Sequence, residues 1–132
     1  MASIPDDAVY LLEGTHLAHV ATVNEDGSPQ VTPVWVDHDG DTVLINTARG
    51  RIKEQNLSRE PRVSISIVDS EKPYQPLLIQ GRAVELTEDG ADQHIDKLAK
   101  RYLDEDVYPF RGEDEVRVTV RIEPYLASYG MG

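Results

Sequence analysis

The chain has 132 residues, a formal net charge of −11 and no cysteine, and this length supports one domain with one hydrophobic core. The absence of thiols excludes disulfides, cysteine-ligated metal clusters and thiol catalysis. The acidity argues against general nucleic-acid binding, because an acidic surface repels a phosphate backbone. No apolar run approaches the roughly 18 residues of a membrane-spanning helix, and no basic-then-apolar leader begins the sequence. We therefore expect a cytoplasmic protein that does not insert into a membrane.

The first half of the chain is predicted to contain one helix and three strands. Ser3 is a candidate helix cap ahead of acidic residues, and the helix is expected to run to about Glu13 and to stop at Gly14. Runs of small and β-branched residues, separated by turn sequences such as residues 37–40, predict the strands, the first two of which form a hairpin. These strands are expected at residues 16–23, 30–36 and 42–46.

The second half is predicted to contain two helices and three strands. Apolar residues recur at i, i+3, i+4 and i+7 from Ile95 to Tyr102, which indicates one apolar helix face. Gly81 predicts a bulge or bend in its strand. Six strands in total, with only three helices, predict a single mainly β domain over residues 1–132, a six-stranded antiparallel barrel. The remaining elements are expected as helix 51–59, strands 62–68, 77–86 and 116–122, and loop 103–115.

A cluster of basic residues marks the junction between strand 42–46 and helix 51–59. Five basic residues there face only Glu54 and Glu60. Positive charge at a strand-to-helix junction that contains Gly50 suits an anionic group such as phosphate. The alternative is a solvated basic helix with ordinary surface ion pairs. The basic residues are Arg49, Arg51, Lys53, Arg59 and Arg62.

Strand 30–36 is a second candidate for ligand contact. Pro33 lacks a backbone N–H, so its backbone is free to meet something other than a neighbouring strand, unless it only protects a sheet edge. Trp35 is either a platform for a ring, an interface anchor or a core residue. Because a barrel this small is filled by its own side chains, a sizeable ligand must lie outside it or between subunits. We therefore expect a homodimer with ligands at its interface.

The four histidines do not form a metal-site pattern. His16 and His19 are separated by an odd number of residues on a strand, so they point to opposite faces. His38 lies in a predicted turn, and His94 is expected on an acidic helix surface. The chain has neither a Gly-x-Ser-x-Gly nucleophile elbow nor a Gly-x-Gly-x-x-Gly fingerprint. We expect no metal, and the pattern identifies no catalytic residue.

Four segments of the chain carry a resemblance to a known family. They are Leu17-Ala18-His19-Val20-Ala21-Thr22-Val23, Asp26-Gly27-Ser28-Pro29-Gln30-Val31-Thr32-Pro33-Val34-Trp35, Asn46-Thr47-Ala48-Arg49-Gly50-Arg51-Ile52-Lys53 and Asn56-Leu57-x-x-x-Pro61-Arg62-Val63. Together these segments resemble the pyridoxamine 5′-phosphate oxidase-like split β-barrel superfamily and, more narrowly, its deazaflavin-dependent (coenzyme F-420) branch, the flavin/deazaflavin oxidoreductases of group B. The resemblance covers almost the whole chain, including residues 80–83 and 116–118.

This resemblance implies a six-stranded split barrel and a homodimer with two cofactors in grooves between the subunits. The resemblance implies that the cofactor's phosphate contacts Thr47, Arg51 and Lys53, and that the ring lies along the backbone of Gln30, Val31, Thr32, Pro33, Val34 and Trp35. It also implies that Asn46, Ala48 and Ile52 line the rest of the pocket. Tyr74 and Gln75 are implied to help close it.

The implied function is reduction of a small conjugated or quinone-like substrate by reduced coenzyme F-420, which carries the hydride itself. FMN is the alternative cofactor, because Arg51 and Lys53 would serve either phosphate; Arg49 and Arg59 favour F-420, whose tail carries further negative charge. A protein that binds the cofactor without catalysis is the other alternative. The resemblance does not extend to vitamin B6 oxidation, since the C-terminal Arg-x-His motif of the true oxidases is missing after Arg121.

Overall fold

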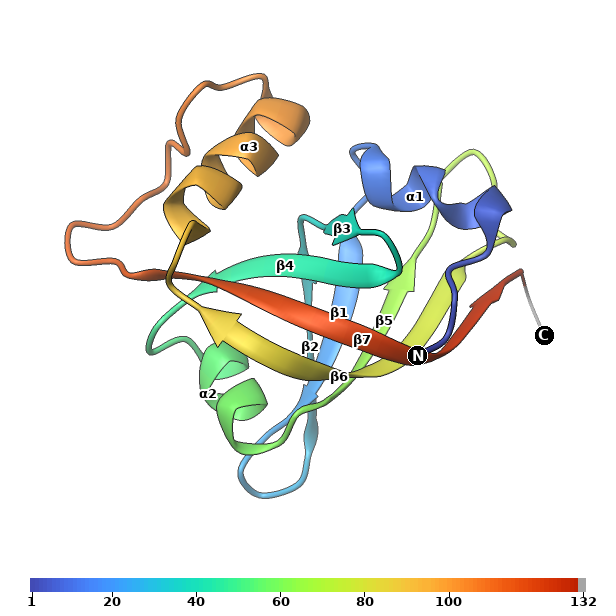
Figure 1. Ribbon diagram of the computed structural model, residues 1–132, viewed down its shortest axis with the longest axis horizontal. Coiled ribbons are helices and arrows are strands. Elements are labelled where there is room, and N and C mark those ends of the chain that lie inside the picture. The colour runs from blue at the N-terminus through green and yellow to red at the C-terminus, as the bar shows by residue number, and fades with distance from the viewer. Residues whose placement is uncertain (131–132) are drawn as a thin grey trace.

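The computed structural model describes residues 1–130 and contains one antiparallel β-sheet that curls around a single core (Figure 1). None of the helices in this described part is long and apolar enough to cross a membrane. The strands are β1 (Ala18–Val23), β2 (Pro29–Val34), β3 (Asp37–Asp39), β4 (Thr42–Ala48), β5 (Arg62–Ile67), β6 (Leu77–Thr87) and β7 (Arg117–Tyr129). The helices are the 3₁₀-helix η1 (Asp6–Ala8) and the α-helices α1 (Tyr10–Glu13), α2 (Ile52–Arg59) and α3 (Ala91–Leu103).

The strand order places two consecutive strands at opposite edges of the sheet. Within residues 1–130, seven strands pair in the order β2-β1-β5-β6-β7-β4-β3, and every pair is antiparallel. Only Trp35 and Val36 separate β2 from β3, so the sheet must curl until its two edges approach each other. A mainly β, antiparallel fold with three α-helices is thus confirmed, but the expected number of strands, six, is wrong.

The additional strand is β3, which the sequence predicts as a turn. Asp37–Asp39 pairs with residues 42–44 of β4, and the reversal is confined to Gly40 and Asp41, with Gly40 at a φ of 60°. The polar composition of this segment is typical of a turn. Backbone pairing with β4 and the burial of Asp37 keep it extended instead.

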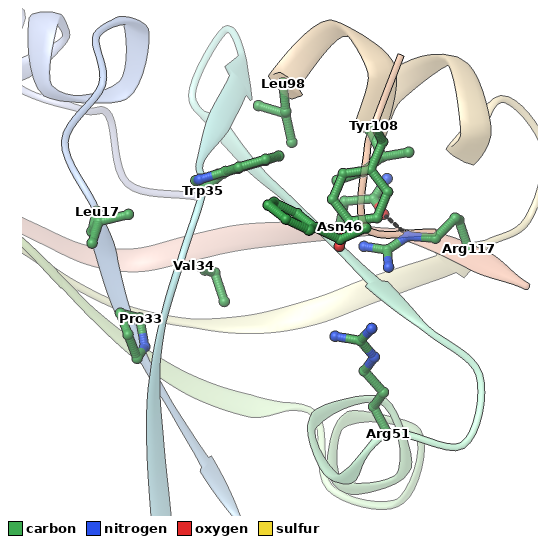
Figure 2. Close-up of a pocket in the computed structure, with 11 residues that line it drawn as sticks. Leu17, Pro33, Val34, Trp35, Asn46, Arg51, Leu98, Tyr108 and Arg117 are labelled. Atoms are coloured by element: carbon green, nitrogen blue, oxygen red, sulfur yellow. Dashed lines mark hydrogen bonds between the residues drawn. The ribbon is translucent and has the colours of Figure 1, made fainter. Parts of the chain in front are cut away.

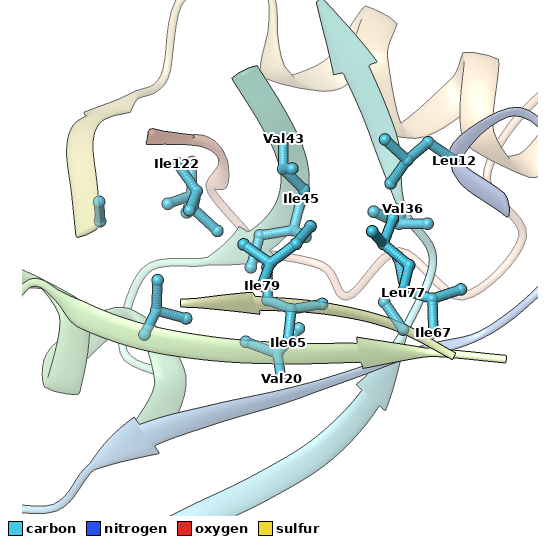
Figure 3. Close-up of a cluster of buried hydrophobic side chains, with 14 of the residues drawn as sticks. Leu12, Val20, Val36, Val43, Ile45, Ile65, Ile67, Leu77, Ile79 and Ile122 are labelled. Carbon is cyan, nitrogen blue, oxygen red and sulfur yellow. The ribbon is translucent and has the colours of Figure 1, made fainter. Parts of the chain in front are cut away.

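The core lies between the two halves of the curled sheet. Val20, Ile65 and Ile79 come from one half, whereas Ile45 and Ile122 come from the other, and each is at most 2% exposed (Figure 3). Burying a side chain of this kind contributes about 1.5–3 kcal/mol. Helix α1 adds its two buried leucines to the same core.

Strand β7 is longer than expected because a glycine accommodates its proline. The strand continues beyond Ile122 to Tyr129, although Pro124 lies within it. Pro124 faces Gly81 of β6 at a shift in register. A Cβ atom on Gly81 would lie 2.5 Å from the carbonyl oxygen of Glu123, so only glycine allows the strands to approach this closely. The predicted bend at Gly81 is confirmed.

The two longer helices, α2 and α3, pack against the strands whose ends lie close together at one side of the sheet. Helix α3 packs on β7 and β4, and its predicted apolar face is confirmed by the burial of Ile95 and Leu98. Helix α2 packs against β1 and β4. At the N-terminus the prediction of Ser3 as a cap is wrong: η1 begins after Pro5, and no side chain caps it.

Candidate functional site

An open cavity of about 210 Å³ lies where the ends of β2 and β4, the start of β7 and helix α3 approach one another (Figure 2). Apolar and aromatic side chains form most of its lining, and two arginines lie at one side. The lining residues are Leu17, Pro33, Val34, Trp35, Asn46, Arg51, Ile95, Leu98, Tyr108, Phe110 and Arg117.

Aromatic rings build one wall of this cavity. Trp35 lies one residue beyond the end of β2, whereas the sequence predicts it within the strand. Its ring stacks on Tyr102, with centroids 5.2 Å apart and planes 14° apart, and meets the edge of Tyr108 at 5.9 Å. The Tyr102 hydroxyl donates to the carbonyl of His16 at 2.6 Å and accepts the backbone N–H of Val36 at 3.1 Å. These contacts fix the orientation of the wall.

Two arginines at the other side of the cavity share one carboxylate, and their charges also act on Lys53. Arg51 lies 2.8 Å from Glu115 Oε1, and Arg117 Nη1 lies 3.1 Å from Glu115 Oε2. Burial first, and then the charges of Arg51 and Arg117, lower the pKa of Lys53. Among the described residues no carboxylate pairs with Lys53. This excess of positive charge favours an anionic group.

Arg117 is a site residue that the periodic pattern of β7 does not identify. It alternates with valines in the sequence, yet its side chain is only 3% exposed. Its Nε donates to Asn46 Oδ1 at 2.9 Å, and its guanidinium lies 5.0 Å from the ring centroid of Tyr108. The ion pair with Glu115 lacks hydrogen-bond geometry, so within residues 1–130 Arg117 Nη1 is a buried donor without an acceptor. The charge of this guanidinium is balanced by Glu115, and its Nη1 hydrogens remain open to a further acceptor such as an anionic ligand.

A chain of polar contacts runs from Arg117 away from the cavity. Asn46 Nδ2 donates to the carbonyl of Ala91 at 3.0 Å and lies 3.2 Å from Nδ1 of His94. His94 Nε2 lies 3.2 Å from Asp37 Oδ2. The expectation that His94 lies on an exposed helix surface is wrong, because α3 turns this residue toward β4 and leaves its side chain 11% exposed.

The chain of contacts ends at a buried carboxylate. Asp37 Oδ1 lies 2.7 Å from Arg101, and Asp37 Oδ2 lies 3.1 Å from Lys97. Burial acts to raise the pKa of Asp37, but hydrogen bonds from His94, from the His38 backbone and from Lys97 bring it well below the usual range of an aspartate. Asp37 is therefore ionised at neutral pH. Within residues 1–130, no three His, Asp or Glu side chains form a group that could hold a metal ion.

Some residues implied by the resemblance lie at this cavity, and others do not. Thr47 and Ala48 are buried in β4 next to Asn46, and Ile52 is exposed at the start of α2. Farther along β2, Gln30 accepts a hydrogen bond from Thr22, the Thr32 hydroxyl is buried, and Val31 faces outward. Those that line the cavity are Pro33, Val34, Trp35, Asn46 and Arg51, with Lys53 beside Arg51.

Tyr74 and Gln75 lie apart from the cavity within one chain. Tyr74 is 78% exposed. Gln75 accepts a hydrogen bond from Tyr129 at 3.1 Å and lines a separate cavity with Tyr10. Closure of the site by Tyr74 and Gln75 stays a prediction.

The basic cluster divides into two groups. Arg49 pairs with Glu54 and with Glu88, each at 3.0 Å. Arg59 donates to the carbonyl of Val23 and to Asn56 Oδ1. These two arginines are engaged in structural contacts and are not among the cavity-lining residues, so they no longer favour F-420 over FMN.

Sequence reasoning also misses the aromatic and apolar lining outside strand 30–36. Tyr108 and Phe110 belong to a segment predicted only as loop, and Ile95 and Leu98 read as ordinary core residues of a helix. Leu17 precedes β1 and gives no local signal. Only the fold brings these positions together, so the periodic pattern does not distinguish them.

Comparison with known proteins identifies the family. The profile of the pyridoxamine 5′-phosphate oxidase family matches residues 4–127. A solved F-420 reductase has a TM-score of 0.84 and 30% sequence identity, with 95% of this chain and 98% of that chain covered.

Two further solved structures share the fold at lower identity. General stress protein 26 of Bacillus anthracis str. Sterne has a TM-score of 0.70 at 19% identity, covering 95% of this chain and 92% of that chain. HupZ of Group A Streptococcus has a TM-score of 0.66 at 21% identity, covering 98% and 99%. The profile match and the structural likeness together show that this chain belongs to the pyridoxamine 5′-phosphate oxidase family, with its split-barrel fold.

Proposed function

We propose that this protein is an oxidoreductase that binds coenzyme F-420 in the cavity beside Trp35 and uses it to reduce a small conjugated or quinone-like substrate. The observation that carries this proposal is the aromatic wall beside Arg51 and Arg117, which share the Glu115 carboxylate, with Lys53, unpaired among the described residues, close to both. A flat ring system with an attached phosphate matches that combination of groups. FMN also has both parts and is the alternative cofactor.

The residues present fit such a group. Arg51 and Arg117 offer guanidinium N–H donors to a phosphate, Arg117 Nη1 has a donor to spare, and Lys53 adds a further positive charge. Trp35 and Pro33 present apolar surface against which a ring can pack and from which water is excluded. When bound, the reduced deazaflavin supplies the hydride. The protein would bind and orient its ligands, and this role requires no side-chain nucleophile.

We propose further that the active form is a homodimer. The cavity of about 210 Å³ is open, whereas sites that enclose a drug-sized ligand have about 300–1,000 Å³. The outer face of the sheet carries exposed Val31, Leu78 and Leu126 around a groove formed by β1, β2, β5, β6 and β7. A second copy would bury this apolar face. The resemblance implies that Tyr74 and Gln75 help to close the pocket, and in a dimer they would do so from the neighbouring subunit.

F-420 is preferred over FMN because a solved F-420 reductase shares 30% identity with this chain over nearly its whole length. The charge of the basic cluster gives no further support, since Arg49 and Arg59 are engaged elsewhere. A binding protein without catalysis is the remaining alternative. It would need the same cavity and would differ only in turnover.

Two measurements test the proposal. The purified protein is titrated with F-420 and separately with FMN, and the two dissociation constants are measured by calorimetry. A lower Kd for FMN than for F-420 would identify FMN as the cofactor. Reduced F-420 is then mixed with the protein and a quinone such as menadione, and its reoxidation is followed by absorbance. Sustained turnover above the protein-free rate supports an oxidoreductase. Binding without turnover across a panel of quinones and enones supports a binding protein.

A further inference from the structure

We infer that His94 is a positioning residue, which keeps Arg117 oriented toward the anionic part of the bound cofactor only while the imidazole is neutral. The identity of the ligand rests on the proposed function. The hydrogen-bond chain behind the inference belongs to the protein alone and can be tested without ligand.

The chemistry of Arg117 fixes the orientation of the Asn46 amide. A guanidinium N–H can only donate, so the atom that faces Arg117 Nε at 2.9 Å must be the amide oxygen. The NH₂ group of Asn46 then faces the carbonyl of Ala91 at 3.0 Å and Nδ1 of His94 at 3.2 Å. The amide has one orientation that satisfies all three contacts.

This orientation in turn fixes the tautomer of His94. Nδ1 faces a donor, so it must carry a lone pair, and the proton of the neutral ring resides on Nε2. Nε2–H then donates to Asp37 Oδ2 at 3.2 Å. Asp37 accepts at its other oxygen from Arg101, so the carboxylate is held in place from the far side. Each donor in the chain meets an acceptor only when His94 is neutral.

A second proton on His94 would break this order. It would reside on Nδ1 and face the Asn46 NH₂ group, so that two donors meet. The amide would have to withdraw or rotate, and rotation would present NH₂ instead of oxygen to Arg117. Arg117 would lose the acceptor that orients it beside the cavity and would retain Glu115 as its charged partner. Protonation of His94 should therefore weaken anion binding.

Charged groups around the imidazole act in both directions on its protonation. The Asp37 carboxylate favours the charged ring, whereas the cations that pair with Asp37 oppose it. Another cavity, which His94 also lines, brings two further acids and one further base. The groups are Asp37 on β3, Lys97 and Arg101 on α3, Arg117 beyond Asn46, and Glu85, Asp89 and Arg121 around the second cavity.

A ligand-free measurement on the wild-type protein tests the chain of contacts directly. The ¹⁵N resonances of the His94 ring, the Arg117 Nε–H and the Asn46 amide are followed by NMR from about pH 8 to about pH 5.5. We expect the Nε2–H tautomer at the higher pH, and we expect all three signals to change with one midpoint. An Nδ1–H tautomer, or an Arg117 signal that does not follow the ring, would overturn the inference.

A binding measurement tests the consequence for the cofactor. His94→Asn retains an oxygen acceptor near the Nδ1 position but cannot gain a proton, and His38→Asn is the matched control, since His38 bonds to Glu13 and Gly40 away from the cavity. The Kd for F-420 is measured for each protein at about pH 8 and about pH 5.5. For each protein, the Kd at the lower pH is divided by the Kd at the higher pH. This ratio should be about tenfold larger for the wild type than for His94→Asn, which corresponds to one hydrogen bond to a charged group. His38→Asn should follow the wild type.

The outcomes separate this inference from the proposed function. Protonation of the ligand and of distant groups changes the Kd of both proteins equally, so it cancels when the pH dependence of the wild type is compared with that of His94→Asn. Equal pH dependence in wild type and His94→Asn overturns the role of His94 and leaves cofactor binding intact. Absence of F-420 and FMN binding at both pH values would instead overturn the proposed function, and the ligand-free NMR result would then still decide whether His94 orients Arg117.

Discussion

Glu115 Oε1 lies 2.8 Å from the guanidinium of Arg51, and this ion pair links residues 64 positions apart in the sequence. It ties the start of α2 to the segment that precedes β7. The other oxygen of Glu115 lies beside Arg117. Burial acts to raise the pKa of Glu115, but contacts with Arg117 and Arg51 lower it, so the carboxylate remains ionised and balances part of the positive charge at the cavity.

Replacing Glu115 by Gln should destabilise the ligand-free protein and make it sensitive to added anions. The variant keeps the side-chain shape but leaves the cations at the cavity with no carboxylate. Its melting temperature should fall, and sodium sulfate should restore more of it than sodium chloride at equal ionic strength. Differential scanning fluorimetry measures this effect. The same sulfate response in wild type and variant would show that Glu115 does not act as the counter-ion of the site.

The stability difference between wild type and Glu115→Gln should also depend on pH. The folded-state pKa of Glu115 lies below the ordinary value of 4.5, so the folded chain binds fewer protons than the unfolded chain in the range between these values. The stabilisation by ionised Glu115 is therefore complete above about pH 4.5 and is lost as the pH falls toward the folded-state pKa. Urea unfolding of both proteins at several pH values measures the difference in their free energies of unfolding. This difference should decrease only below about pH 4.5.

Lys53→Ala should weaken F-420 binding by about tenfold to a hundredfold, the worth of a hydrogen bond between charged groups. The effect should diminish as salt rises, because ions screen the wild-type contact. Arg49→Ala is the matched control: Arg49 belongs to the same basic cluster, but Glu54 and Glu88 already pair with it. Calorimetric titration at two salt concentrations measures both variants. If Lys53→Ala and Arg49→Ala lose the same affinity for F-420, Lys53 has no specific role, and the cluster is an ordinary solvated basic surface.

Lys53→Met should stabilise the ligand-free protein while it impairs binding. The folded-state pKa of Lys53 lies below 10.5, so the charged side chain destabilises the folded state at neutral pH, and this penalty disappears as the pH rises toward 10.5. The melting temperature of the variant should exceed that of the wild type by a few degrees near neutrality and should match it at alkaline pH. A destabilised variant would indicate that Lys53 has a structural partner.

Trp35 is the only tryptophan in the sequence and lies at the cavity wall, so its fluorescence should report cofactor binding. We expect quenching by F-420 that saturates with the Kd found by calorimetry. Trp35→Leu should weaken binding by about twofold to tenfold through loss of aromatic contact. Binding without quenching would place the ring elsewhere on the protein.

Leu126→Arg should dissociate the homodimer and weaken cofactor binding. Leu126 lies on the apolar outer face of the sheet, where a second copy would cover it. Leu103→Arg is a suitable control, because Leu103 is also exposed but lies at the end of α3. Sedimentation velocity with F-420 present distinguishes the two variants. A monomeric wild type, or a dimer that tolerates Leu126→Arg, would contradict the proposed interface.

Local patterns predicted most elements of the fold, because the signals involved span only a few residues. The alternation of Val63, Ile65 and Ile67 identifies β5, and the helical spacing of Ile95 and Leu98 identifies α3. The sequence does not predict β3, because its extended conformation depends on pairing with β4, which overrides a polar, turn-like composition.

The site was harder to predict because it is built from contacts between distant segments. Arg49 and Arg51 are almost adjacent and locally equivalent, yet Glu88, 39 residues from Arg49, helps to neutralise it. Arg117 turns inward toward Asn46, 71 residues away. No periodicity over a short window contains such information, and only the family resemblance pointed to residues 116–118.

The stacking of Trp35 on Tyr102 has a consequence for folding kinetics. The Tyr102 hydroxyl accepts the backbone N–H of Val36 across 66 positions of the sequence, so the cavity wall is complete only after these distant segments have met. Contacts of this range form late, since loop-closure entropy must be overcome first. A ligand that binds at Trp35 therefore selects the fully closed chain and should act mainly by slowing unfolding, with little effect on the folding rate.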